Sequence, residues 1–245
     1  MYHFFVEPSL IQGQDIYIEG SDYNHIKNVL RMKIGEVISV GDGLSDKDYR
    51  CHIEEYTDTA VHCRLDFIKE SGVELPVRVT LFQGLPKSDK MELIIQKCVE
   101  LGVAEVIPVA CSRSIVKLDA KKEKSKITRW NGISEAAAKQ SKRAIIPEVK
   151  SVMSYKEAID YARSLDVNLL PYELAEGFDA TRKIMGSIKS GQSVGIFIGP
   201  EGGFSEEEVK LAEEAGFEPI TLGRRILRTE TAAMVVLSWL IYFYE

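Results

Sequence analysis

A glycine-rich segment that follows an apolar run of the chain has the composition of a ligand-binding loop. The run ends at Ile198, and the sequence continues GPEGGF (199–204). Glycine adopts backbone angles closed to other residues and lets the main chain approach a ligand closely. The segment matches neither the GxxxxGKS/T pattern that cradles nucleotide phosphates nor the GxGxxG pattern of dinucleotide sites, which disfavours ATP and NAD. A tight strand-to-helix turn capped by Ser205 is the structural alternative.

A second segment places three arginines and a glutamate directly before an apolar helix. The sequence GRRILRTETAA (223–233) contains Arg224, Arg225, Arg228 and Glu230. Arginines near a helix N-terminus oppose the helix dipole, which prefers acidic groups there. A local rule broken in this way often marks a functional site. These arginines could stabilise developing negative charge or bind phosphate, whereas an ion pair with a glutamate is the structural alternative.

The segment 112–143 is strongly basic although the whole chain is acidic. It holds ten lysines and arginines against three acidic residues, a local charge of +7, whereas the chain has a net charge of −6. Because lysine and arginine contact nucleic-acid phosphates, the segment is a candidate nucleic-acid surface. A solvated helix face is the alternative, and it is the commoner origin of a charge run. The basic residues are Arg113, Lys117, Lys121, Lys122, Lys124, Lys126, Arg129, Lys139, Lys142 and Arg143.

Elements that could position these segments are visible from Leu75 onward. Strand-like runs alternate there with helical patterns, which predicts an α/β domain with a mainly parallel sheet. Ligands of open α/β sheets bind outside the carboxyl ends of strands, so a site is expected after Leu170, Ile198 and Leu222. The expected strands are Val77–Leu81, Val103–Val109, Val167–Leu170, Val194–Ile198 and Pro219–Leu222, and the expected helices are Lys87–Leu101, two helices that follow the capping boxes Ser154/Glu157 and Ser205/Glu208, and a last helix from about Thr229.

The first third of the chain is patterned differently. Short alternating runs separated by turn signals predict a small β-rich domain. The exception is Asp22–Met32, whose apolar spacing indicates a short helix that carries Lys27 and Arg31 outward. The pattern of short alternating runs ends near residue 72. A chain of 245 residues is long enough for two domains. We therefore expect domains at 1–72 and 73–245.

Membrane and secreted proteins are disfavoured by the sequence. The N-terminal MYHFFVEPSL lacks a basic region followed by an apolar run, so no secretory signal is expected and a cytoplasmic location is predicted. The most apolar stretch, Ala232–Phe243, is too short to cross a bilayer and is expected to be a buried helix.

A metal site is also disfavoured. The four cysteines form no CxxC pair and are expected to be reduced and structural. Cys51-His52 and His62-Cys63 could meet across a hairpin as a metal site. Neighbouring strand residues point to opposite faces, however, so each face would offer about two of the four ligands that zinc prefers. No metal is therefore expected.

The two site segments, taken together, resemble a known family. IGPEGGFSEEE (198–208) followed by LGRRILRTETAA (222–233) is similar to the signature of the RsmE family of 16S rRNA uridine N3-methyltransferases. The similarity covers nearly the whole chain in the family's order, with a departure at Lys142, where the family more often has glycine. The other matching stretches are HIKNVLRMKIGE (25–36), SDKMELIIQKCVELGV (88–103), SRSIV (112–116) and RWNGISEAAAKQSKR (129–143).

The resemblance implies a fold that periodicity cannot reveal. It implies an N-terminal PUA-like β-barrel that binds RNA, a C-terminal SPOUT α/β domain with a deep trefoil knot, and a homodimer. Three knot loops would hold S-adenosylmethionine largely through backbone groups, which glycines and small residues permit. Carried onto this sequence, the expected cofactor-binding residues are Leu170, Pro171, Glu173, Ile198, Gly199, Pro200, Glu201, Gly202, Gly203, Leu222, Gly223, Ile226, Leu227, Arg228 and Thr231.

The resemblance also implies methyl transfer to uridine N3. That reaction needs the base held in line with the methyl group and help in removing the N3 proton. Arg228 is the expected catalytic group, stabilising the uracil anion or holding a phosphate, with Glu230 or Glu201 orienting it. The substrate is expected to be 16S rRNA in the small ribosomal subunit, with its uridine unstacked. The expected RNA contacts are Lys27, Arg31, Arg113, Arg129 and Arg143.

Three other functions stay open from the sequence alone. Another SPOUT methyltransferase, acting on tRNA or on another rRNA position, would share the fold and the cofactor. A non-catalytic RNA-binding or ribosome-assembly factor would keep the fold without the cofactor, which the intact GPEG (199–202) and RTE (228–230) sequences disfavour. An ordinary nucleotide-dependent enzyme is disfavoured because the phosphate-binding patterns are missing.

Overall fold

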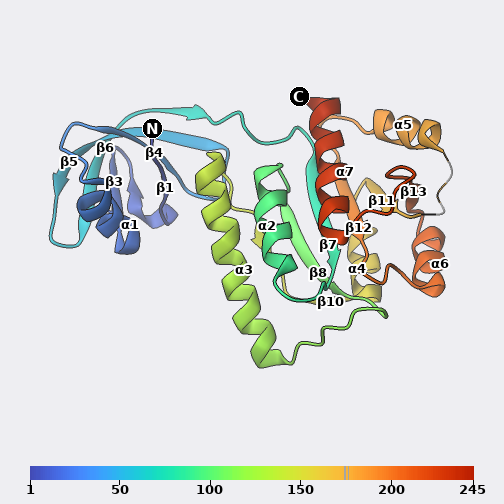
Figure 1. Cartoon of the computed structure of the whole chain (residues 1–245). Helices are drawn as coiled ribbons and strands as arrows, with labels where there is room; N and C mark the ends of the chain where they lie inside the picture. The colour runs from blue at the N-terminus through green and yellow to red at the C-terminus, as the bar shows by residue number, and fades with distance from the viewer. Residues whose placement is uncertain (174, 176) are drawn as a thin grey trace. The chain divides into compact units, whose positions relative to one another are not determined.

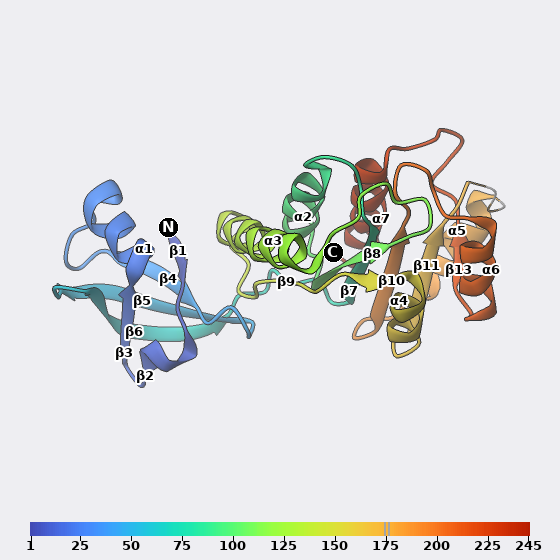
Figure 2. The same ribbon diagram turned by 90° about the horizontal axis from the view of Figure 1, so that it is seen from below.

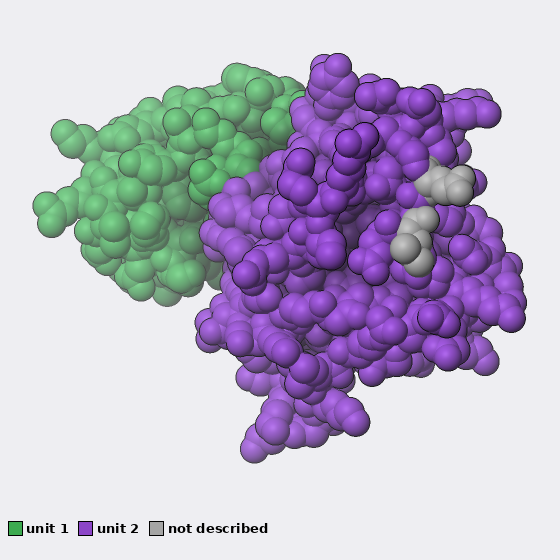
Figure 3. All heavy atoms as spheres, turned by 45° about the vertical axis from the view of Figure 1, so that its right-hand side comes forward, with its two compact units in different colours: residues 1–74, 138–146 green, residues 75–137, 147–245 purple. Residues whose placement is uncertain are grey.

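The chain forms two compact units (Figure 3). The first contains Met1–Glu74 and Ala138–Ile146, and the second contains Leu75–Ala137 and Pro147–Glu245. The computed structural model describes residues 1–173, 175 and 177–245. Within those residues, no helix combines the length and apolarity that a membrane crossing requires.

A six-stranded sheet forms the first unit (Figure 2). Its strands are β1 (His3–Phe5), β2 (Ile11–Gln12), β3 (Asp15–Glu19), β4 (Val37–Gly41), β5 (Lys47–Tyr56) and β6 (Ala60–Glu70), and its helical segments are a 3₁₀ turn (Pro8–Leu10), α1 (Gly20–Asn24) and a π-helical stretch (His25–Leu30). The strand order is β1-β4-β5-β6-β3-β2, and only β1 and β4 pair in parallel. No hydrogen-bonded pairing of described residues joins β1 to β2, so the closed barrel stays a prediction.

Alternation along the strands builds the core of this unit. In β6, Val61 and Cys63 are fully buried, whereas His62 between them is only partly buried. Cys51 of β5 lies in the same core. A hydrogen bond with Cys63 and burial raise the pKa of the Cys51 thiol, which disfavours the thiolate that binds metals. These cysteines are free thiols, as expected.

The helix expected over Asp22–Met32 is present but divided. α1 ends at Asn24 and continues directly into the π-helical stretch. Arg31 then takes a left-handed φ of 52°, which ends the helical segment. Lys27 and Arg31 are both exposed, as the apolar spacing indicates.

The second unit is a parallel α/β sheet, as the alternation of patterns predicts. Its strands are β7 (Arg78–Gly84), β8 (Glu105–Ala110), β9 (Glu148–Val149), β10 (Met153–Ser154), β11 (Val167–Pro171), β12 (Ser193–Ile198) and β13 (Glu218–Ile220). Its helices are α2 (Lys90–Glu100), α3 (Ala120–Ser141), α4 (Tyr155–Ala162), α5 (Phe178–Ser187), α6 (Glu206–Glu214) and α7 (Thr229–Tyr244), and residues 138–141 at the end of α3 belong to the first unit. The strand order is β10-β8-β7-β12-β11-β13, with β9 on β8, and all these pairings are parallel.

Helices cover both faces of this sheet (Figures 1 and 2). On one face α4 and α6 contribute Ile159 and Val209 to a buried cluster. The strands contribute Phe82 and Phe197, whose rings stack at 4.1 Å between centroids across β7 and β12. Burial of each such ring stabilises the fold by roughly 1.5–3 kcal/mol. On the other face α2 and α7 lie side by side.

Sequence signals locate three of these helices well. The capping boxes at Ser154 and Ser205 are both present, and the last helix begins at Thr229 as expected. Two helices, α3 and α5, were not predicted. α3 carries most of the basic segment over 22 residues, so much of that segment is a charged helix.

Candidate active site

The predicted site segments begin at one edge of the parallel sheet. β12 lies between β7 and β11, and β11 pairs with β13, so the segments that follow these strands start at neighbouring positions. Tyr172, just after β11, donates its N–H to the Ile220 carbonyl at 3.0 Å and joins the first segment to the third. The strand order alone therefore brings together segments that are far apart in sequence.

The glycine-rich loop is pressed against the end of β7. A Cβ atom at Gly84 would lie 2.6 Å from Pro200 Cδ, so glycine is required there. Gly203 donates its N–H to the Pro200 carbonyl at 2.8 Å with a φ of +67°, which forms a tight turn. Arg113 Nη1 donates to the Gly202 carbonyl at 3.0 Å. The loop is thus held in one conformation from two sides.

A buried chain of hydrogen bonds lies behind this loop. The Thr229 hydroxyl donates to the Gly199 carbonyl at 2.7 Å and accepts from Gln83 Nε2 at 2.8 Å. Gln83 Nε2 also donates to the Gly84 carbonyl at 3.0 Å, which uses both amide hydrogens. Gln83 is fully buried, and its Oε1 atom has no partner in the described part of the chain. An unpaired buried acceptor costs about 1–3 kcal/mol, which favours a bound donor here.

Lys90, the first residue of α2, lies between two glutamates of the site. Its Nζ atom is 2.8 Å from Glu201 Oε1 and 3.7 Å from Glu230 Oε2. The Lys87 backbone N–H donates to the Glu201 carboxylate at 3.2 and 3.3 Å. The hydrogen bond to Glu201 raises the pKa of Lys90. Burial alone would raise the pKa of Glu201, but Lys90 and backbone donors outweigh it and lower that pKa.

Arg228 is the exposed N-cap residue of α7. The sequence predicts that Glu230 or Glu201 orients it, but the structure pairs both glutamates with Lys90. Arg228 itself pairs with no carboxylate among the residues that the structure describes. The charge of Arg228 lowers the pKa of Lys90, against the larger effect of the hydrogen bond to Glu201.

The remaining predicted cofactor residues differ in exposure. Leu170 and Ile198 are buried at the ends of their strands, whereas Ile226 is 88% exposed. Gly223 has a φ of +110°, which favours glycine. Together the segments offer glycine backbone and apolar side chains, which suits a flat heterocycle bound by main-chain groups. Pro200 is buried, and Pro171, Gly199, Leu222, Gly223 and Leu227 are half-buried. Glu173, Gly202, Gly203, Arg228 and Thr231 are exposed, as is Glu201 taken as a whole residue, although its side chain is only 26% exposed.

Four of the five predicted RNA contacts are exposed. Lys27 and Arg31 lie on the first unit, and Arg113 and Arg129 lie on the second. Arg129 pairs with Glu92 at 2.8 Å and keeps 64% of its side chain exposed. These side chains are accessible to a phosphate backbone.

Arg143 differs from its prediction. Its side chain is 3% exposed, and its Nε atom donates to Glu74 Oε1 at 3.2 Å within the first unit. A buried arginine paired with a carboxylate stabilises the fold, because removing either partner leaves a buried charge alone. This burial does not support an RNA contact, and we leave Arg143 out of the proposed RNA surface.

A cluster around His62 is the nearest approach to a metal site in the described residues. His62 Nε2 is 2.8 Å from Asp15 Oδ1 and 3.6 Å from Glu54 Oε2. Arg64 also donates to Asp15 Oδ1, at 2.8 Å. Since the guanidinium already supplies a cation to this carboxylate, the cluster gives no ground for assigning a metal.

A cavity of about 460 Å³ lies at the opposite edge of the parallel sheet. Its lining includes Asp166, Asn168 and Glu218, from the amino ends of β11 and β13. Ligands of open α/β sheets bind at the carboxyl ends instead. The cavity is therefore separate from the candidate site.

Two residues of the candidate site were not predicted from the sequence. Gln83 is a polar residue inside the apolar run VTLFQG (79–84), and that interruption is a visible signal. Lys90 lies in the matching stretch SDKMELIIQKCVELGV (88–103), but nothing there indicates its partners.

Comparison with known families identifies both units. The profile of the RNA methyltransferase domain matches residues 73–241, and that of the RNA methyltransferase PUA domain matches residues 18–66. Ribosomal RNA small subunit methyltransferase E of Bacillus subtilis is 37% identical, over 100% of this chain and 98% of its own. The protein of the same name from Mesomycoplasma hyopneumoniae is 34% identical, over 97% and 98%.

Solved structures give the same result. Ribosomal RNA small subunit methyltransferase E from Neisseria gonorrhoeae, bound to S-adenosyl methionine, has a TM-score of 0.84 and 29% identity over 100% of this chain and 98% of its own. A methyltransferase from Legionella pneumophila in complex with the cofactor SAM has a TM-score of 0.84 and 31% identity over 98% and 97%. The chain therefore belongs to the RNA methyltransferase family, together with the ribosomal RNA small subunit methyltransferase E proteins.

Proposed function

We propose that this chain transfers a methyl group from S-adenosylmethionine to N3 of a specific uridine in 16S rRNA of the small ribosomal subunit. The observation that carries the proposal is that the Thr229–Gly199 hydrogen bond joins the loop 199–203 to the start of α7. The names of the relatives and the cofactor in similar structures support it. The choice of uridine N3 follows from the resemblance to the RsmE family.

The cofactor would be held by main-chain groups after Leu170, in 199–203 and in 222–227. When bound, S-adenosylmethionine supplies the electrophilic methyl group. The chain from Gln83 through Thr229 to Gly199 holds the glycine-rich loop in place. This preorganisation matters because methyl transfer is an in-line displacement, in which positioning is the main catalytic device.

We assign Arg228 to the uracil. Loss of the N3 proton leaves negative charge on the base, and a guanidinium can stabilise that charge or hold a neighbouring phosphate. Arg228 is exposed and free of carboxylate partners among the described residues, so it is able to reach the RNA. Glu230 orients Arg228 only indirectly in this proposal, through its contact with Lys90.

The RNA would be held by both units. Lys27 and Arg31 of the first and Arg113 and Arg129 of the second would contact phosphates, while the uridine leaves its stack. From the resemblance we further propose that residues 1–72 form a PUA-like β-barrel and that residues 73–245 form a SPOUT domain with a trefoil knot. We also propose that the protein acts as a cytoplasmic homodimer.

Methylation of small ribosomal subunits from a strain that lacks the gene tests the proposal. With labelled S-adenosylmethionine, we expect N3-methyluridine in 16S rRNA, identified by mass spectrometry of the nucleosides. Arg228→Ala should reduce the rate by roughly 100-fold or more. Arg163→Ala is the control, because Arg163 is 59% exposed, pairs with Asp160 and lines the cavity at the opposite edge. Cofactor binding without any methyluridine would mean that the substrate is assigned wrongly.

A further inference from the structure

Lys90 joins two segments of the candidate site that are far apart in sequence. Its ammonium contacts Glu201 of the glycine-rich loop and Glu230 in the first turn of α7. α2, which begins with Lys90, lies beside α7 (Figure 1). The side chains of Lys90, Glu201 and Glu230 are 27%, 26% and 16% exposed. Because they are partly shielded from water, their mutual attraction is stronger than that of surface charges.

The chain reaches this position through unfavourable local structure. Ser88 has a φ of 56°, in the left-handed region that non-glycine residues seldom adopt. Asp89, the N-cap residue of α2, makes no side-chain capping hydrogen bond. An ammonium group on the first helical residue also opposes the helix dipole. Such features persist where surrounding contacts enforce them, and they concentrate at functional sites.

We infer that Lys90 is a positioning residue that binds the carboxylates of Glu201 and Glu230 and thereby leaves Arg228 free for the RNA. Two anions and two cations share this region, and the structure pairs both anions with one cation. Without Lys90, the two partly buried carboxylates would lack their cationic partner, and they would attract the guanidinium of Arg228, two residues before Glu230. Arg228 would then be drawn to the protein and away from the substrate.

Replacing Lys90 should affect the affinity for the cofactor less than it affects the rate of methyl transfer. Two backbone contacts from the Lys87 N–H to Glu201 do not depend on the Lys90 side chain. The Thr229–Gly199 hydrogen bond also remains. The glycine-rich loop therefore keeps two anchors when Lys90 is changed. The inference rests on the proposed function and predicts a loss in kcat rather than in cofactor affinity.

Lys90→Met tests this, since it removes the charge and keeps an unbranched side chain. We expect kcat for methylation of small ribosomal subunits to fall about tenfold or more. The Kd for S-adenosylmethionine, measured by calorimetry, should change by less than about threefold. Adding Glu230→Gln to Lys90→Met removes one unpaired carboxylate, so kcat should recover several-fold relative to Lys90→Met alone. Lys90→Arg, which keeps the charge, should retain most of the activity.

Lys150→Met is the matched control. Lys150 also lies between two glutamates, with Nζ 2.5 Å from Glu148 and 3.5 Å from Glu105. Its side chain is 33% exposed, close to the value for Lys90, and its pKa is raised by its hydrogen bond to Glu148. It lies at the amino end of β8, so we expect this variant to keep wild-type kinetics.

Three outcomes would overturn the inference. The first is a Lys90→Met enzyme with the same kcat and KM as Lys150→Met. The second is a double variant that recovers no activity over Lys90→Met. The third is a folded Lys90→Arg enzyme that is as slow as Lys90→Met, since the requirement would then be for shape and not for charge. An inactive wild-type protein would contradict the proposed function itself, before any variant is compared.

Discussion

Gln83 and Lys90 are two site residues whose partners the sequence does not predict. In the sequence Gln83 follows the expected strand Val77–Leu81, and only the structure places it inside β7 as a fully buried residue that needs partners. Its partner Thr229 is 146 positions away, and Glu201 is 111 positions from Lys90. The sequence identifies Arg228 and the two glutamates as candidates, but their pairing depends on which strand ends are neighbours. Strand order is not encoded in local periodicity, so the pairing was predicted wrongly.

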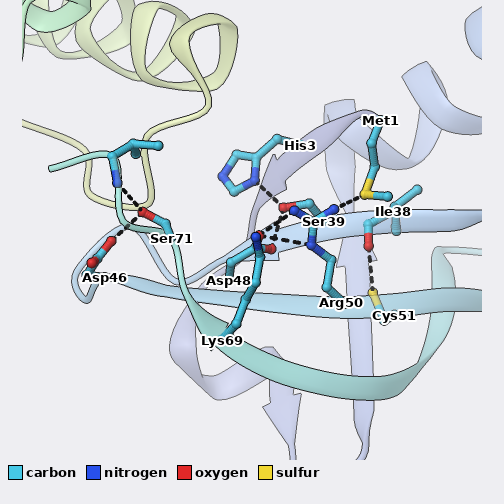
Figure 4. A network of polar contacts seen from close by, with 11 residues as sticks. Met1, His3, Ile38, Ser39, Asp46, Asp48, Arg50, Cys51, Lys69 and Ser71 are labelled. Carbon is cyan, nitrogen blue, oxygen red and sulfur yellow. Dashed lines mark hydrogen bonds and ion pairs between the residues drawn. The ribbon is translucent and has the colours of Figure 1, made fainter.

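His3 provides a prediction at the same scale. It lies in a polar network of the first unit (Figure 4), with Nδ1 2.7 Å from Ser39 Oγ, which donates to Asp48 Oδ1 at 2.6 Å. Burial lowers the pKa of His3 from 6.5 to about 4, although Asp48 acts in the opposite direction. The unfolded chain therefore binds a proton near pH 6.5, whereas the folded chain binds it only near pH 4.

Stability should accordingly be full above pH 6.5 and decline as the pH falls towards 4. We expect the free energy of unfolding, from urea titrations across this window, to fall by on the order of 1–3 kcal/mol. His3→Gln should remove most of this dependence. His52→Gln, at an exposed histidine paired with Asp66, is the control. A slope that His3→Gln leaves unchanged would show that other groups titrate.

At the scale of elements, the sequence predicts where a helix begins when one short segment contains all the residues that cap it. The capping boxes at Ser154 and Ser205 are complete within four residues, and both helices begin as predicted. α3 has no capping box, because Lys122 stands where a glutamate would be needed, although Asp119 accepts the Lys122 N–H at 2.9 Å just before the helix. The division of the predicted helix 22–32 into α1 and a π-helical stretch was not visible in its apolar spacing either.

The two capping boxes should differ in strength. Glu208 is buried, and besides the Ser205 N–H at 2.8 Å it accepts the Ser112 N–H at 2.7 Å. Glu157 is exposed, and among the described residues it hydrogen-bonds only within its own box. Glu208→Ala should lower the free energy of unfolding by about 2–3 kcal/mol, and Glu157→Ala should lower it by clearly less. Urea unfolding measures both, and equal effects would mean that the Ser112 contact contributes nothing.

At the scale of the whole molecule, the distribution of charge matters more than its total. A net charge of −6 would repel RNA, so binding must depend on local groups of arginine and lysine. The sequence predicts such a basic segment at 112–143 but cannot separate its exposed members from its buried ones. Arg129 is exposed, whereas Arg143, in the same segment, is buried against Glu74. Which basic residues are buried depends on packing between residues that are distant in sequence.

Arg129 therefore yields a prediction on RNA binding. Arg129→Gln should weaken binding to small-subunit rRNA and reduce the slope of log K against log salt by about 0.7–0.9, the contribution of one phosphate contact. Cofactor affinity should not change. Arg163→Gln, with a similar exposure of 59%, should leave both quantities at their wild-type values. An unchanged salt slope in Arg129→Gln would remove this residue from the RNA surface.

The first unit draws on two stretches of chain, Met1–Glu74 and Ala138–Ile146. During synthesis the second stretch leaves the ribosome only after β7, α2 and β8 of the other unit have already emerged. Until then Glu74 has no Arg143 to pair with, and the first unit lacks its last segment. Domains commonly fold as units in order of synthesis, but here the first unit is complete only after residues 75–137 of the second unit have been synthesised. A nascent chain that pauses before residue 138 therefore holds an unfinished first unit, and completion of the two units is coupled in time.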